Sequence, residues 1–99
     1  MLSHVVVFWT KAEEADAADK CMASAQRHLA NIPGLLSFHV GKMSPSERSV
    51  VDQSYQVALS ATFADRATET AYQAHPQHLA FLEECKQLWE KVVVYDFAG

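Results

Sequence analysis

The sequence predicts an α+β protein of the ferredoxin-like class, with one four-stranded antiparallel sheet that carries its helices on one face. Segments rich in β-branched and aromatic residues alternate with segments that have an apolar stripe of helical period. Their order along the chain is β-α-β-β-α-β, which is the split βαβ arrangement. A chain of 99 residues supports one hydrophobic core, so residues 1–99 are predicted to form a single domain.

Turn and cap residues separate these elements. Pro33 and Gly34 end the first helix, because proline cannot continue a helix and glycine tolerates a positive φ. Asp65 is predicted to cap a short helix, and Pro76 suits the first turn of the helix that follows it. The predicted elements are strand 4–9, helix 13–30, strand 35–42, strand 55–63, helix 65–74, helix 76–91 and strand 92–97.

The first predicted strand is apolar on both of its alternating faces. One face carries His4, Val6 and Phe8, and the other carries Val5, Val7 and Trp9. We expect the face with His4 to point away from the helices, and an uncovered face of this kind would be a large exposed apolar patch. The chain is therefore predicted to form a homodimer whose two sheets pack face to face around a barrel cavity. Ligand pockets usually occupy about 300–1,000 Å³, so the second chain is expected to supply half of the walls.

Composition argues against several classes of protein. Eight Lys and Arg against twelve Asp and Glu give a net charge of −4, so no nucleic-acid partner is expected. No apolar run approaches the ~18 residues needed to cross a membrane, and no signal peptide is recognised. Cys21 and Cys85 are predicted to be buried, reduced thiols in a cytoplasmic protein. Metal-ligand, nucleophile-elbow and phosphate-loop motifs are lacking, so neither a metal nor a cofactor is expected.

Residues 72–78 are the most informative polar segment. Tyr72 on the short helix and His78 on the next helix flank a proline corner. An imidazole exchanges a proton near neutral pH, and a phenol donates a hydrogen bond to a developing oxyanion. The pair is therefore suited to acid–base work on a bound carbonyl compound. The alternative is structural, with Tyr72 packing its ring and His78 bonding a backbone carbonyl at the corner. His75 is predicted to have a capping role, and His4, taken alone, is typical of a satisfied core residue.

Four segments resemble the stress-responsive A/B barrel (Dabb) family over nearly the whole chain: residues 4–8, 32–41, 72–81 and 92–97. The resemblance implies a dimeric α+β barrel. It also implies site residues, because a polyketide cyclase of this family uses a tyrosine and a histidine that match Tyr72 and His78. There the histidine removes a proton between two carbonyls, and the tyrosine assists at the substrate oxygen without any cofactor.

The resemblance extends to the cavity walls. A first-strand histidine and a tryptophan that line the cyclase cavity match His4 and Trp89, whereas a third cavity histidine is replaced by Val57. Some plant members hold a metal ion on backbone carbonyls that match Leu29, Ile32 and Leu35. Three functions remain open at this point. One is a small-molecule-binding, cofactor-free cyclase or lyase with His78 as base and Tyr72 as its acid partner. The others are a non-catalytic stress or binding protein and a cofactor-free monooxygenase with the same barrel.

Overall fold

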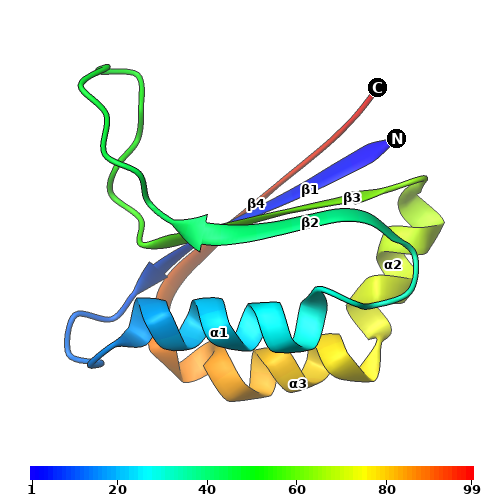
Figure 1. Cartoon of the computed structure of the whole chain (residues 1–99), viewed down its shortest axis with the longest axis horizontal. Coiled ribbons are helices and arrows are strands. Elements are labelled where there is room, and N and C mark those ends of the chain that lie inside the picture. Colours follow the sequence, from blue (N-terminus) through cyan, green and yellow to red (C-terminus); the bar gives the residue numbers. More distant parts are fainter.

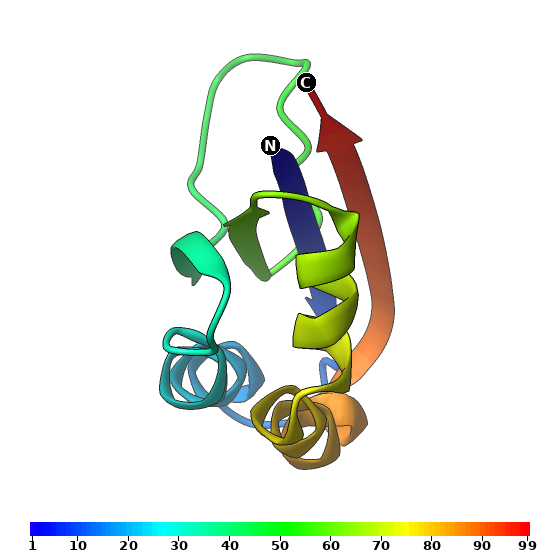
Figure 2. The ribbon, with the colours of Figure 1, turned by 90° about the vertical axis from the view of Figure 1, so that its right-hand side faces the viewer.

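The computed structural model describes all 99 residues, as one sheet with helices packed on a single face (Figures 1 and 2). The sheet is antiparallel and has the strand order β2-β3-β1-β4. The elements are β1 Leu2–Thr10, α1 Ala17–Leu29, β2 Leu35–Lys42, β3 Val57–Phe63, α2 Arg66–Ala74, α3 Pro76–Cys85, a 3₁₀ turn Lys86–Leu88 and β4 Trp89–Ala98. The predicted ferredoxin-like class is confirmed. None of the helices combines the length and apolarity that a membrane span requires.

Several predicted boundaries were wrong, and two of the differences have a local reason. The first helix begins at Ala17 because Asp16 adopts a left-handed φ of 56°, so the residues before it form turns. The long helix ends at Cys85, and one 3₁₀ turn leads into β4 at Trp89. The apolar stripe that suggested a helix to residue 91 therefore ran across two different elements. The third strand begins at Val57 instead of Tyr55.

The two faces of β1 point in directions opposite to those expected. Leu2, His4, Val6 and Phe8 are buried on the helix-covered face, whereas the alternate residues are only partly buried. The prediction that His4 faces away from the helices was therefore wrong, since both faces of this strand are apolar and the pattern cannot say which one the helices cover. On β2, a register shift between Leu35 and Ser37 leaves Leu36 exposed.

Capping residues form the corner between α2 and α3 as predicted. The Asp65 carboxylate accepts a hydrogen bond from the Thr68 amide at 2.8 Å and so begins α2. His75 ends α2 and begins α3, where its Nδ1 accepts from the Gln77 amide at 3.1 Å and Pro76 occupies the first turn. His75 and Pro76 therefore form the corner between the helices that carry Tyr72 and His78.

A close approach of the loop after α1 positions α2. Gly34 has a φ of +98°, and a Cβ atom built there would lie 2.5 Å from the Thr68 Cγ2 atom. Only glycine combines this backbone conformation with such a short contact. The loop between β2 and β3 lies at the other end of the sheet and projects beyond it (Figure 1).

Candidate functional site

A cavity of about 140 Å³ lies between the sheet and the helices. Of its 13 lining residues, 10 are hydrophobic. The lining residues are His4, Val6, Phe8, Leu29, Leu59, Tyr72, Gln73, His78, Phe81, Leu82, Trp89, Val92 and Val94. All of them lie on the sheet or on the helices of this chain, and the expectation that a second chain contributes to the cavity walls stays a prediction. The helices close this chamber over the inner face.

Tyr72 and His78 both line the cavity, and their rings pack edge to face against each other. Their ring centroids are 4.9 Å apart with an interplanar angle of 64°. Tyr72 is 1% and His78 is 7% exposed, and His78 Nδ1 is buried without a hydrogen-bond partner. Buried polar groups are normally paired, so an unpaired ring nitrogen beside a cavity is suited to a ligand.

The apolar surroundings shift the pKa values of both groups. Burial raises the pKa of the Tyr72 hydroxyl, and the nearby Glu69 carboxylate raises it further. Burial also lowers the pKa of His78, and the proximity of His4 lowers it further, against smaller opposing effects of Glu69 and the Gln73 backbone. At neutral pH the site therefore holds a protonated phenol beside a neutral imidazole, which has a free lone pair.

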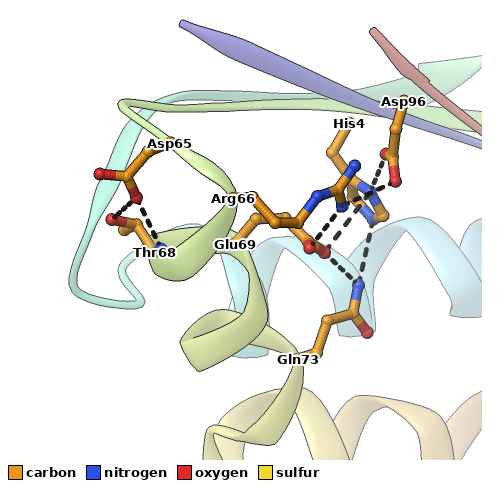
Figure 3. Close-up of polar contacts among 7 residues, drawn as sticks. All are labelled: His4, Asp65, Arg66, Thr68, Glu69, Gln73 and Asp96. Carbon is orange, nitrogen blue, oxygen red and sulfur yellow. Dashed lines mark hydrogen bonds and ion pairs between the residues drawn. The ribbon is translucent and has the colours of Figure 1, made fainter. Parts of the chain in front are cut away.

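His4 lines the cavity and belongs to a network of polar contacts with residues of α2 and β4 (Figure 3). Its Nδ1 atom is 2.6 Å from Asp96 Oδ1 on the neighbouring strand β4 and 3.7 Å from Glu69 Oε2 on α2. The Gln73 amide nitrogen donates to Glu69 Oε2 at 2.7 Å and lies 3.5 Å from His4 Nε2. Arg66 Nη1 binds both carboxylates, at 2.9 Å from Glu69 and 3.0 Å from Asp96.

The contacts with His4 and Arg66 also lower the pKa of Asp96. Partial burial of the carboxyl raises it, but the hydrogen bonds from His4 and Arg66 together outweigh burial. Asp96 is therefore an anion at neutral pH, and it can accept but not donate a hydrogen bond.

Trp89 and Val57 are placed differently with respect to the cavity. Trp89 forms an aromatic wall with Phe8 and Phe81, at centroid distances of 4.8 and 5.5 Å, and its indole nitrogen donates to Cys21 Sγ at 3.4 Å. Val57 is fully buried but lies outside the lining, where β3 contributes Leu59 instead. The structure thus brings Tyr72, His78, His4 and Trp89 together and leaves Val57 apart from them.

Sequence reasoning missed the charged and polar residues behind His4. Arg66, Glu69 and Gln73 recur at intervals of three and four, which places them on one helix face. Asp96 is the polar member of an otherwise apolar alternation with Val92 and Val94. Both patterns are visible in the sequence and indicate polar groups aimed at the cavity side. No group of three or more His, Cys, Asp or Glu side chains is arranged to hold a metal ion.

Comparison with known proteins places the chain in a family. Residues 2–98 match the family described as Stress responsive A/B Barrel Domain, or Dabb. The chain belongs to this family. Olivetolic acid cyclase of Cannabis sativa is a relative 25% identical over 97 residues, which cover 97% of this chain and 94% of the cyclase.

Solved structures agree on the Dabb fold. A Dabb family protein with a ferredoxin-like fold from Mesorhizobium loti is 28% identical, with a TM-score of 0.78 over 99% of this chain and 95% of that one. A dimeric ferredoxin-like protein of unknown function from Thermobifida fusca is 22% identical, with a TM-score of 0.80 over 99% and 90% of the two chains. The second likeness shows the fold alone.

Proposed function

We propose that this Dabb protein binds a small carbonyl compound in its cavity and carries out cofactor-free acid–base chemistry on it, with His78 as the base and Tyr72 as the hydrogen-bond donor. The observation that carries the proposal is the unpaired, buried His78 Nδ1 beside the Tyr72 ring in a largely apolar cavity. The relationship to olivetolic acid cyclase supports a cyclase-like reaction.

The lowered pKa of His78 and the raised pKa of Tyr72 suit this division of roles. A C–H bond beside a carbonyl breaks, its proton passes to neutral His78, and its electron pair forms an enolate. The Tyr72 hydroxyl stays protonated and donates a hydrogen bond to the enolate oxygen. In a cyclisation, the enolate carbon then attacks a second carbonyl of the same molecule, and the proton on His78 passes to the new alkoxide. Atoms and electrons balance without an oxidant or a cofactor.

The size of the cavity limits the part of the substrate that reacts inside it. An engineered protein cavity of about 150 Å³ holds benzene, so 140 Å³ accommodates one six-membered ring. Val92 and Val94 line the cavity but are 41% and 49% exposed, which places an opening beside β4. A longer substrate is therefore expected to place its reacting ring inside and its remaining chain in this opening.

We also propose that a second copy of the chain covers the outer face of the sheet. Tyr95 and Phe97 are 60% and 63% exposed there, beside the outward residues of β1. An apolar face of this size is typical of an interface, and the dimeric neighbour from Thermobifida fusca supports one. In this arrangement the partner sheet packs on the face opposite the cavity.

Proton abstraction from a bound ketone tests the catalytic proposal directly. Acetophenone fits the proposed one-ring cavity, and the exchange of its methyl protons in D₂O can be followed by NMR. We expect the wild-type chain to accelerate exchange and His78→Gln to lose about 100-fold or more of that acceleration. Tyr72→Phe is expected to lower the rate as well, because the enolate oxygen loses its donor.

Tyr95→Phe is the matched control, since it removes the same hydroxyl from the outer face. It should leave the exchange rate unchanged. Melting temperatures measured with and without the ketone separate binding from turnover, because a bound ligand stabilises the folded chain. A ketone that raises the melting temperature of the wild type without faster exchange would show a binding protein, and the catalytic proposal would then be abandoned.

A further inference from the structure

The hydrogen bonds around His4 determine which of its ring nitrogens carries the proton. Asp96 is an anion that can only accept, so Nδ1 at 2.6 Å from its Oδ1 must be the protonated nitrogen. On the opposite side of the ring, Nε2 lies 3.5 Å from the Gln73 amide nitrogen, which is a donor. A neutral imidazole with Nδ1 protonated satisfies both neighbours, because its Nε2 lone pair then meets a donor.

The orientation of the Gln73 amide is itself fixed. Its nitrogen lies 2.7 Å from Glu69 Oε2, and only the amide NH₂ group can donate to a carboxylate. The Glu69 side chain is buried, and it is held in place by Arg66 at 2.9 Å. The same guanidinium nitrogen binds Asp96, so one arginine holds the acceptor beside Nδ1 and, through Glu69, the Gln73 amide near Nε2 (Figure 3).

The nitrogen that remains available belongs to a ring that lines the cavity. His4 lines the cavity, and its ring centroid is 6.1 Å from that of Tyr72. The contact from Gln73 at 3.5 Å is long for a hydrogen bond, so Nε2 keeps most of its capacity to accept a shorter one. Another part of the cavity lining is the aromatic wall of Phe8, Phe81 and Trp89.

We propose that Asp96 and Gln73 are positioning residues that hold His4 in the Nδ1-protonated form, so that Nε2 is a fixed acceptor for a hydroxyl group of the ligand. The inference rests on the proposed function in one respect, that the cavity binds a small molecule. It adds the ligand class: a ring that stacks on the aromatic wall and carries a hydroxyl donor, as in a phenol or an enol. His4 thus accepts a hydrogen bond from the ligand, whereas Tyr72 donates one to it.

Nitrogen NMR reports the protonation form of His4 without any ligand. In a chain with ¹⁵N-labelled histidine, long-range ¹H–¹⁵N correlations distinguish the two neutral tautomers from the imidazolium. We expect the Nδ1-protonated neutral form in the wild type at neutral pH. In Asp96→Asn, where the negative charge is lost and the amide NH₂ group can turn to donate to Nδ1, we expect a substantial population of the Nε2-protonated form. A wild-type His4 that is Nε2-protonated or cationic would overturn the proposal.

Phenol and benzene test the acceptor function, because they differ by the single hydroxyl group. We expect phenol to bind the wild type at least as tightly as benzene and to bind Asp96→Asn about tenfold more weakly than the wild type, with benzene affinity unchanged. Asp19→Asn is the matched control, since it makes the same change on the exposed surface of α1 and should alter neither affinity. Equal losses of both ligands, or no binding of either, would contradict the acceptor role.

The two proposals fail in different ways. A phenol preference that depends on Asp96, without catalysed ketone exchange, would remove the catalytic role of His78 and retain the fixed acceptor. Catalysed ketone exchange without a phenol preference would retain the catalytic role of His78 and remove the acceptor role of His4. The wild-type tautomer needs no substitution, so the proposal remains falsifiable even when Asp96→Asn does not fold.

Discussion

The two faces of the sheet are built from the same kind of residue and have different environments. On the inner face, β1 and β3 alternate buried residues against the helices, and the space left between these layers is the cavity. On the outer face, β1 and β4 present apolar side chains that no element of the chain covers, including Tyr95 and Phe97. Hydrophobic alternation therefore predicts a sheet with two faces, but the helices decide which face becomes core and which is left for a partner.

The largest expected effect is a loss of stability, tested by making the same Phe→Ala substitution on each face of the sheet. Phe63 on the inner face is fully buried, and its ring centroid is 5.0 Å from that of Tyr72. Phe63→Ala removes a large core side chain and is expected to lower the free energy of unfolding by about 3–5 kcal/mol. Phe97→Ala removes the same atoms from the outer face and should leave the stability of the single chain nearly unchanged. Urea unfolding at several protein concentrations measures both effects.

The concentration dependence separates the two roles. The midpoint for Phe63→Ala should fall at every concentration, because the loss lies within the chain. For Phe97→Ala, the change should appear only where the dimer is populated. A Phe97→Ala midpoint that falls equally at all concentrations would mean that the outer face is packed within one chain.

The next effect concerns the dimer itself. Val7 lies on the outer face between Ala58 and Val93, near the middle of the sheet. Val7→Arg would bury a charge without a partner in a sheet-to-sheet interface, so we expect dimer dissociation to become at least about 100-fold easier, or about 2.7 kcal/mol. Sedimentation at micromolar concentration should then show the 11.0 kDa monomer.

Ala23→Arg provides the control for this charge. Ala23 is exposed on α1, which lies on the opposite side of the sheet from the proposed interface. The Ala23→Arg variant should therefore sediment as the same species as the wild type. A wild-type chain that is already monomeric, or a dimer disrupted by Ala23→Arg and not by Val7→Arg, would place the interface on the helices instead.

Element types and cap residues could be predicted from the sequence because they depend on local signals. Asp65 begins α2, and Pro76 occupies the first turn of α3, each within a few residues of its sequence signal. Boundaries were wrong where two elements shared one apolar pattern, as across Cys85 and Trp89. The orientation of His4 was wrong because it depends on which face the helices cover, and this is a property of the whole fold.

The candidate site could be predicted in part. The resemblance to the Dabb family led to Tyr72, His78, His4 and Trp89, and the structure places all four around one cavity. It did not indicate that Val57 lies outside that cavity. The partners of His4 lie 65 to 92 positions away in sequence, so no local pattern connects them to it.

The smallest expected effect is the pH dependence that His78 gives to stability. Burial lowers the pKa of His78 from its ordinary value of 6.5, so the unfolded chain binds the proton more readily than the folded one. Its contribution to stability is therefore complete above pH 6.5 and is lost as the pH falls through the lowered pKa. The unfolding free energy of the wild type relative to His78→Gln should decrease between pH 7.5 and pH 5. Urea titrations of both proteins at fixed concentration measure this difference, and a difference that stays constant or grows toward low pH would show that the folded site accommodates a charged imidazole.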